Sequence, residues 1–250
     1  MFDTDGVAGG AEPSTELCRL AERIRPVAPA HRHTLPVLPP LRGLLPGGAL
    51  CRGTTVAVTG APAATSLALA LAAGPSAAGS WVATVGVTDL GLAAAAELGV
   101  ALERLVVVDR PPPSSWATVV ATLVDAFDVV LLGPGQRVRA TDARRLTARA
   151  RERGSVLVVL DPAGGTGRGR VLEPEVVLTV TGARWEGLGW GYGHLRARRV
   201  RVEAAGRRAA ARPRRADLLL GPDVALDVAV PGDGDHQVAP VVALRPPEGG

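Results

Sequence analysis

Lysine is absent from this sequence of 250 residues, in which all 28 basic side chains are arginine. The absence excludes every site that depends on a lysine ammonium group, such as the lysine of phosphate-binding loops. Arginine still pairs with phosphates and carboxylates through its planar guanidinium group. The bias is also typical of a GC-rich coding sequence, so it is not by itself a functional signal.

Aromatic residues, cysteines and long apolar runs are also scarce. Aromatic side chains make up 3% of the chain against a hydrophobic content of 47%, which predicts a core of Ala, Val and Leu. Cys18 and Cys51 form no C-x-x-C pair, which argues against a disulfide framework or a zinc site. Apolar runs such as Leu67–Ala73 are too short to span a bilayer, and the acidic N-terminus lacks signal-peptide features. We therefore expect a soluble, cytoplasmic protein.

The charge is unevenly distributed along the chain. Residues 216–250 contain six acidic residues and one basic residue, so this segment carries −5 and residues 1–215 carry +9 within the net charge of +4. A basic body with an acidic tail indicates a polyanionic partner, and a tail that competes for the basic surface.

Composition divides the chain into three segments. Residues 1–34 form an arm with a short helix and a Pro-rich linker, residues 35–220 a single α/β domain, and residues 221–250 an acidic tail that we expect to be disordered. The short helix presents Leu17, Leu20 and Ile24 on one face. It either packs on its own domain or docks on a partner, and the sequence does not choose between these.

Within the domain, apolar strands alternate with helical segments. Strands that are apolar throughout and separated by helices indicate a parallel sheet covered on both faces. From Val176 onwards the pattern becomes β-rich without helices, which predicts an antiparallel extension at the sheet edge. The strands expected before that point are 54–59, 81–87, 105–108, 128–132 and 155–160.

The loop after the first of these strands has the position of a nucleotide-binding loop. A P-loop reads G-x-x-x-x-G-K-[ST], in which backbone amides and the lysine hold the phosphates. Gly60 matches the first glycine, but Thr65 stands at the second glycine and Ser66 at the lysine. The expected strand–loop–helix frame is retained, while the groups that hold ATP are missing.

The approach to this loop resembles a known family. The segment Leu41–Gly53 (LRGLLPGGALCRG) resembles the entry to the RecA-type ATPase core. The order of elements matches as well, and with the segment Arg184–Gly189 (RWEGLG) the chain resembles the ImuA′ family of high-GC actinobacteria over residues 35–220. The resemblance implies a RecA-like fold with a mostly parallel sheet.

The resemblance also implies a role in damage-induced mutagenesis. Members of this family are RecA-like accessory factors of translesion DNA synthesis in the SOS response, and they have no established reaction of their own. The partners implied are an ImuB-type Y-family-like protein and a DnaE-type error-prone polymerase, with single-stranded DNA as a further candidate. We accordingly expect a nucleoid-associated protein that uses no cofactor.

Two further positions depart from an active RecA-type ATPase. The strand 128–132 is followed by Gly133, where such enzymes carry the Walker-B Asp that helps to hold Mg²⁺. Such enzymes also carry a catalytic Glu just after the second strand, and the nearest acidic residue here is Asp89. Because phosphoryl transfer depends on these groups, we expect no enzymatic activity. The alternatives are an active or nucleotide-binding RecA paralogue in recombination, and a SulA-like inhibitor of cell division.

Two Gly- and Arg-containing loops occupy the positions of RecA-type DNA-binding loops. The loop 133–139 carries Arg137 and Arg139, and the loop 162–170 carries Arg168 and Arg170. Loops at the carboxyl ends of parallel strands commonly bind ligands, and arginine makes charge-assisted contacts with phosphate. The alternative is that these loops, and the Arg-rich helix 141–153, are ordinary solvated surface.

A denser group of arginines lies between residues 196 and 215, where nine of twenty residues are Arg and only Glu203 is acidic. Strand alternation would place several of them on one face. One interpretation is that this face binds single-stranded DNA with an affinity that falls steeply with salt. An equally good interpretation is a surface strand whose arginines are only solvated. The residues assigned to DNA here are Arg196, Arg198, Arg199 and Arg201.

Aromatic residues gather between positions 185 and 192, among several glycines. Base stacking and partner docking are both open to such a cluster. We expect Trp185 to close one end of the core, and we assign Trp190 and Tyr192 to partner binding. No nucleophilic triad, metal cluster or carboxylate pair stands out.

Overall fold

The computed structural model describes residues 33–60, 62–88, 90–135, 138–161, 172–188, 193–221 and 225–228, with only the backbone for 187–188, 193–196 and 225–228. Its helices are α2 (Ala64–Ala77), α3 (Leu92–Glu97), α4 (Trp116–Ala126) and α5 (Ala140–Arg153). The strands are β1 (Thr34–Leu35), β2 (Leu50–Cys51), β3 (Thr55–Thr59), β4 (Val82–Val85), β5 (Leu105–Val108), β6 (Val129–Leu132), β7 (Val156–Asp161), β8 (Val176–Leu188), β9 (Gly193–Gly206), β10 (Arg214–Gly221) and β11 (Ala225–Val228).

One mixed sheet organises these elements. Its strand order is β11-β10-β9-β8-β3-β7-β6-β4-β5. The six strands β8, β3, β7, β6, β4 and β5 are parallel to one another. Strands β9, β10 and β11 continue the sheet beyond β8 in antiparallel pairs. The predicted α/β class and the predicted antiparallel extension are therefore confirmed.

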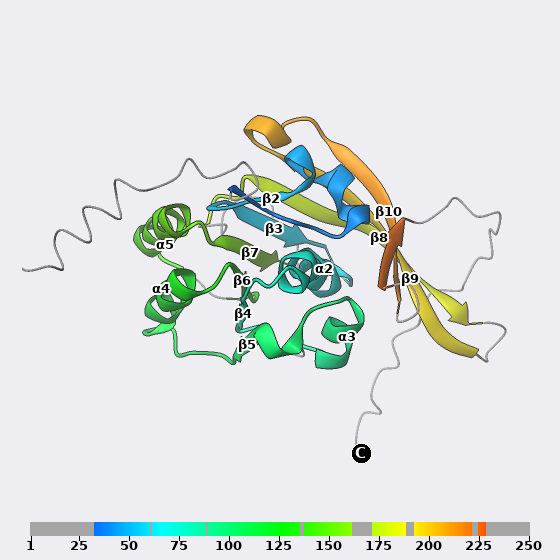
Figure 1. Ribbon diagram of the computed structural model, residues 1–250, viewed down its shortest axis with the longest axis horizontal. Coiled ribbons are helices and arrows are strands. Elements are labelled where there is room, and N and C mark those ends of the chain that lie inside the picture. The colour runs from blue at the N-terminus through cyan, green and yellow to red at the C-terminus, as the bar shows by residue number, and fades with distance from the viewer. Residues whose placement is uncertain are drawn as a thin grey trace, which may run out of the picture.

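Helices cover both faces of the parallel part (Figure 1). On one face, α2 and α3 pack with the strands into a large core of Leu, Val and Ala. On the other face, α4 and α5 form a smaller core centred on Trp116, Val120 and Leu146. Among the described residues, the larger core has no aromatic member, and the smaller one has Trp116 with Phe127 packed against it, which agrees with the low aromatic content.

Helix α2 is the most deeply buried helix, with ten of its fourteen residues buried. Alanines and one glycine fill most of its surface, which lets neighbouring chain segments approach closely. A Cβ on Gly74 would lie 2.7 Å from the Pro36 carbonyl oxygen, so a larger residue there would displace the N-terminal segment. The helix begins directly after the Gly60 loop, and its burial fixes the position of that loop.

The N-terminal part of the domain contains more structure than the sequence indicates. We placed Thr34 in the Pro-rich arm, but Thr34–Leu35 already forms β1 and pairs with β2. The 3₁₀ helix η2 (Pro39–Leu44) follows and contributes the fully buried Leu41 and Leu44 to the core. Apolar residues between the prolines therefore anchor this segment to the domain.

The Arg-rich helix predicted over residues 141–153 is confirmed as α5. Helix α4 begins after Ser115, and α5 ends at Gly154, whose φ of 73° lies in the left-handed region that glycine adopts readily. Helix α5 begins at Ala140, one residue before the predicted start at 141, and no side chain caps it.

Strands β8 and β9 form a long hairpin, with irregular register between Val180 and Gly182 and again between Glu186 and Leu188. The sheet continues past residue 220, because β11 pairs with β10. No helix in the described part of the chain is long and apolar enough to cross a membrane. The same residues contain no group of three or more His, Cys, Asp or Glu that could hold a metal ion.

The burial of α2 predicts the cost of truncating it. Leu71 is 0% exposed, so Leu71→Ala should lower the free energy of unfolding by about 2–5 kcal/mol through lost burial and a residual cavity. Leu92 is 49% exposed, and Leu92→Ala should change it by less than about 0.5 kcal/mol. Urea denaturation of both variants measures this, and equal effects would contradict the assigned packing.

Candidate functional site

The carboxyl edge of the parallel strands is the candidate site. In open α/β sheets, ligands bind at this edge, because the loops that follow the strands converge there. Gly60 follows β3 and Gly133 follows β6. Asp161 is the last residue of β7 and lies in register with Thr59, so the sheet itself brings a carboxylate to this edge.

Gly60 is packed against the neighbouring strand. Its φ of 89° lies in the left-handed region, and a Cβ at this position would lie 2.3 Å from the carbonyl oxygen of Val180 in β8. Only glycine fits such an approach without a shift of the backbone. The packing of β3 against β8 is thus enough to require this glycine, without any bound phosphate.

The start of α2 also departs from a phosphate-binding loop. Thr65 and Ser66 lie in its first turn, and Ala63 at the N-cap supplies no capping side chain. The position after Ser66 is Leu67, which is fully buried. A P-loop has Ser or Thr there to bind Mg²⁺, so this is one more departure that the sequence contains.

An arginine from the distant strand β9 occupies the loop. One nitrogen of the Arg198 guanidinium group donates a hydrogen bond to the Ser66 hydroxyl oxygen at 2.5 Å, and another donates to the Pro62 carbonyl oxygen at 3.3 Å. Burial lowers the pKa of Arg198 below its ordinary value. The cation thus lies where the P-loop lysine would begin, but it binds the loop itself.

Trp185 lies over this arginine. The Arg198 Cζ atom is 4.8 Å from the centre of the Trp185 ring, a cation–π distance. The two residues are direct cross-strand partners in the β8–β9 hairpin. Trp185 is 46% exposed, so the expectation that it closes one end of the core is wrong.

Gly133 is closely packed as well. A Cβ on it would lie 2.0 Å from the carbonyl oxygen of Gly86, which follows the adjacent strand β4. The Gly133 amide donates a hydrogen bond to the Val85 carbonyl oxygen at 2.8 Å. The space for an aspartate at the Walker-B position is therefore filled by backbone.

Arginines of the predicted DNA-binding strand are engaged by neighbouring groups. Arg199 pairs with Glu186 at 3.0 Å, and Arg201 pairs with Asp217 at 2.9 Å. Arg198 is turned into the Gly60 loop, as described above. The strand therefore does not present these arginines as a continuous cationic face. Two more pairs, Arg215–Glu203 and Arg207–Glu173, flank it at 2.8 Å each.

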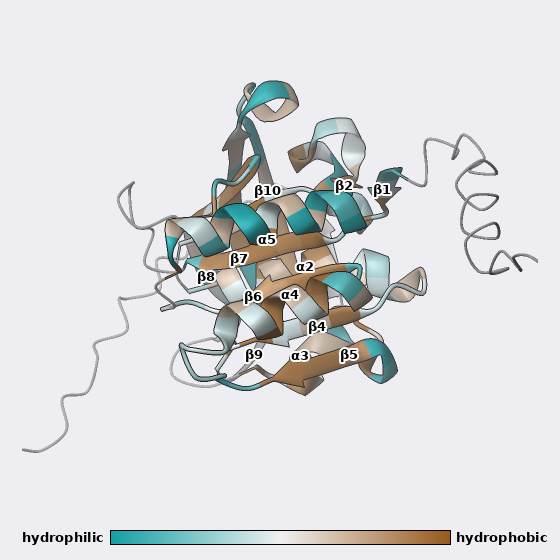
Figure 2. Cartoon of the chain, turned by 90° about the vertical axis from the view of Figure 1, so that its left-hand side faces the viewer, coloured by the Kyte–Doolittle hydropathy of each residue, from teal (hydrophilic) through white to brown (hydrophobic). Residues whose placement is uncertain are grey.

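Helix α5 shows a similar balance of charge. Its outer face is hydrophilic (Figure 2), but Arg149 and Arg153 both pair with Asp125 of α4. These arginines, Arg149 foremost, hold the pKa of Asp125 below its usual value. Arg139 is exposed at the N-cap of α5, beside Asp142, and lines a surface groove of about 520 Å³ with Trp116.

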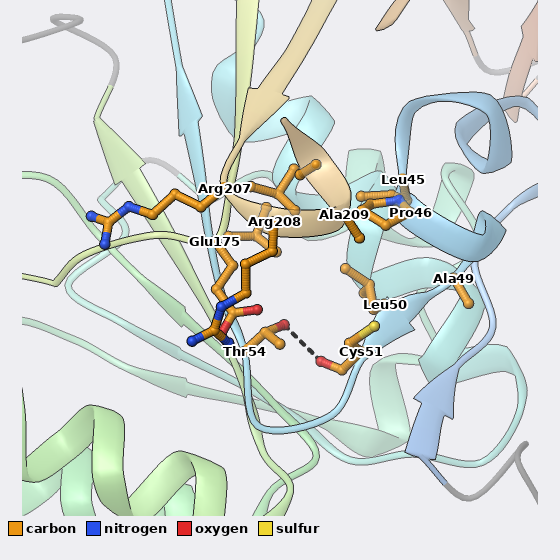
Figure 3. Close-up of a pocket in the computed structure, with 13 residues that line it drawn as sticks. Leu45, Pro46, Ala49, Leu50, Cys51, Thr54, Glu175, Arg207, Arg208 and Ala209 are labelled. Carbon is orange, nitrogen blue, oxygen red and sulfur yellow. Dashed lines mark hydrogen bonds between the residues drawn. The ribbon is translucent and has the colours of Figure 1, made fainter. Parts of the chain in front are cut away.

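A separate pocket lies at the opposite, amino end of β3 and β8 (Figure 3). Leu45, Leu50 and Ala210 provide part of its apolar lining, and Arg207 and Arg208 also line it. Its volume of about 130 Å³ is smaller than the roughly 300–1,000 Å³ of typical ligand sites. The pocket is therefore too small for a nucleotide.

Several predicted site residues cannot be placed by the described geometry. For Arg196 only the backbone is described. The residues that lie outside the described parts of the chain are Leu17, Leu20, Ile24, Asp89, Arg137, Arg168, Arg170, Trp190 and Tyr192.

Sequence reasoning missed the contact between Arg198 and Ser66. It joins residues 132 positions apart, and no local pattern marks such a pair. Only the alternation of the hairpin offers a signal, because Arg198 and Arg199 point to opposite faces of a strand. The first turn of α2 lies on one of those faces.

Comparison with known proteins places the likeness in the parallel core. Residues 43–165 match the family model described as "MT3502 N-terminal domain", a range that runs from η2 to just beyond β7. The uncharacterized protein Rv3395c of Mycobacterium tuberculosis is 42% identical over 121 residues. That match covers 47% of this chain and 57% of the relative, so the chain spans little more than half of the relative's length. The chain is thus similar to this domain family over the range from η2 to β7, which excludes β8 and the antiparallel strands.

Proposed function

We propose that the chain is a non-catalytic RecA-like accessory factor of the ImuA′ type, acting in damage-induced mutagenesis and translesion DNA synthesis. Its partners in this proposal are an ImuB-type Y-family-like protein and a DnaE-type error-prone polymerase, and it also contacts DNA. The proposed location is the cytoplasm, in association with the nucleoid.

The order of elements supports the RecA-like part of the proposal. Strand β3 enters the Gly60 loop and helix α2, and the apolar strand β6 ends at Gly133, where a Walker-B strand would end in Asp. A further helix and strand and then a β-rich end follow, as the resemblance implies. This order of strands and helices supports the proposed RecA-like frame.

The position of Arg198 is the observation that carries the non-catalytic part. In an active site, the cation of the loop must be free to contact phosphate oxygens. Here the guanidinium group donates its hydrogen bonds to Ser66 and Pro62 of the loop itself. The close packing of Gly60 against Val180 and of Gly133 against Gly86 acts in the same direction, because it fills the space at both positions with backbone.

A protein without a reaction of its own acts through contacts. The hydrophilic outer face of α5 and the exposed Trp185 on the hairpin are candidate surfaces for such contacts. This agrees with an accessory role, in which the fold presents surfaces to partner proteins and to DNA. The resemblance supplies the identity of those partners.

The first test is nucleotide binding. Isothermal titration of the full chain with ATP and Mg²⁺ should give no micromolar binding, because Arg198 fills the loop and Leu67 replaces a Mg²⁺ ligand. Arg198→Ala should also fail to bind, because the packing of Gly60 remains. Micromolar binding of ATP by the unaltered chain would overturn the proposal. Micromolar binding by Arg198→Ala alone would show that the Arg198 side chain, and not the packing of Gly60, prevents ATP binding.

The second test restores a Walker-B aspartate. Gly133→Asp should lower the free energy of unfolding by more than about 2 kcal/mol and should produce no ATPase activity, since the new side chain meets the Gly86 backbone. Gly182→Ala is the control, because a Cβ there meets nothing within 4 Å. A stable Gly133→Asp protein with Mg²⁺-dependent ATPase activity would contradict the proposal.

The third test addresses the partners. Affinity capture of the tagged full chain from cells with damaged DNA should recover an error-prone polymerase complex, and a Leu71→Ala variant of low stability should recover less. Recovery of a cell-division protein in place of polymerases would favour the SulA-like alternative and would rule out the proposed partners.

A further inference from the structure

The contacts of Arg198 with the Gly60 loop do not explain why the Trp185 side chain is exposed to solvent. Its residue surface is 46% exposed, although tryptophan has one of the largest apolar surfaces to bury. Among the described side chains of β8, β9 and β10, it is the only large hydrophobic one that is exposed. A flat ring of this kind, open to solvent, offers a surface to a ligand with a flat apolar face.

The ring is held in a defined position. Arg198 lies 4.8 Å from its centre, and the hydrogen bonds to Ser66 and Pro62 fix that arginine to the start of α2. Strand pairing also places Trp185 directly opposite Arg198. The result is a stack of three layers, with the loop innermost, the guanidinium group in the middle and the indole ring outermost.

We propose that Trp185 is a stacking site for a base of single-stranded DNA. An unpaired base stacks on an aromatic ring whatever its identity, because every base has a π face. The positive charge of Arg198 beneath the ring attracts the neighbouring phosphates. This inference rests on the proposed function, since it names a site for the DNA contact proposed there.

The surroundings of Trp185 favour DNA over a protein partner. A tryptophan that anchors a protein interface lies within a wider apolar patch that excludes water. Here the cross-strand partner of Trp185 is Arg198, while Arg184 lies opposite Arg199 on the other face of the strand. The carboxylate of Glu186 belongs to the opposite face of the strand, where it pairs with Arg199. Aromatic surface combined with positive charge is typical of sites for single strands.

Fluorescence polarisation with a labelled (dT)20 oligonucleotide tests the site in the full chain. Trp185→Ala should weaken binding about tenfold, the size expected for the loss of one base–aromatic stack. Trp185→Phe keeps a ring and should stay within about threefold of the unaltered chain. Thermal unfolding of each variant verifies that the fold is intact.

Trp81 provides the matched control. It is 45% exposed, but its ring meets Phe127 edge-on at 6.2 Å and its amide donates to the Asp128 carboxylate. Trp81→Ala should therefore leave binding unchanged. Stacking releases no counterions, so the tenfold effect of Trp185→Ala should persist at every salt concentration, while the slope of affinity against salt stays constant.

The outcomes separate this site from the proposed function. If the unaltered chain does not bind (dT)20, the proposed DNA contact fails together with this site. If it binds but Trp185→Ala binds equally well, only the site is overturned. Equal losses in Trp185→Ala and Trp81→Ala would also overturn it. Stronger competition by duplex DNA than by single strands would do the same, as would a Trp185→Ala variant that loses a protein partner but keeps DNA.

Discussion

The contact between Arg198 and Ser66 links two parts of the fold that no local rule connects. It fastens the β8–β9 hairpin to the first turn of α2, across 132 positions of sequence. The hairpin also pairs with β3 and buries Leu178, Val180, Val200 and Val202 in the core that includes α2, and this contact adds a polar link at the Gly60 loop. Two consequences follow from one guanidinium group, because it fills the loop and it supports the ring of Trp185.

The close packing of two glycines also removes space for a ligand at the carboxyl edge of the parallel strands. A Cβ on Gly60 would meet Val180, and a Cβ on Gly133 would meet Gly86. These close approaches draw β3 towards β8 and the end of β6 towards the end of β4. A phosphate-binding edge needs room and free amides at the same places. The loss of the phosphate site is therefore distributed over several positions, and no single substitution would reverse it.

The sequence predicts the parallel core well and the edge chemistry poorly. Continuous apolar runs locate β3, β4, β6 and β7, because strands buried on both faces have no polar alternation, and the edge strand β5 is equally apolar although Val107 is exposed. The departures at Thr65, Ser66 and Gly133 are also visible in the sequence. Their physical consequence is not, because it depends on which backbone lies opposite, and such contacts are long-range. The exposure of Trp185 was missed for the same reason.

Arginine content is a poor guide to the location of positive potential in this chain. Arg199 and Arg201 are matched by carboxylates from neighbouring strands, and pairs of this kind at a surface contribute little net stability or net charge. Because the chain has no lysine, arginine forms all of these pairs. A segment rich in arginine can therefore contain many cations that carboxylates already neutralise. Arg198 differs because no carboxylate pairs with it among the described contacts, and its charge lies beneath an aromatic ring. The functional meaning of the segment therefore depends on this one arginine and its tryptophan more than on the number of arginines.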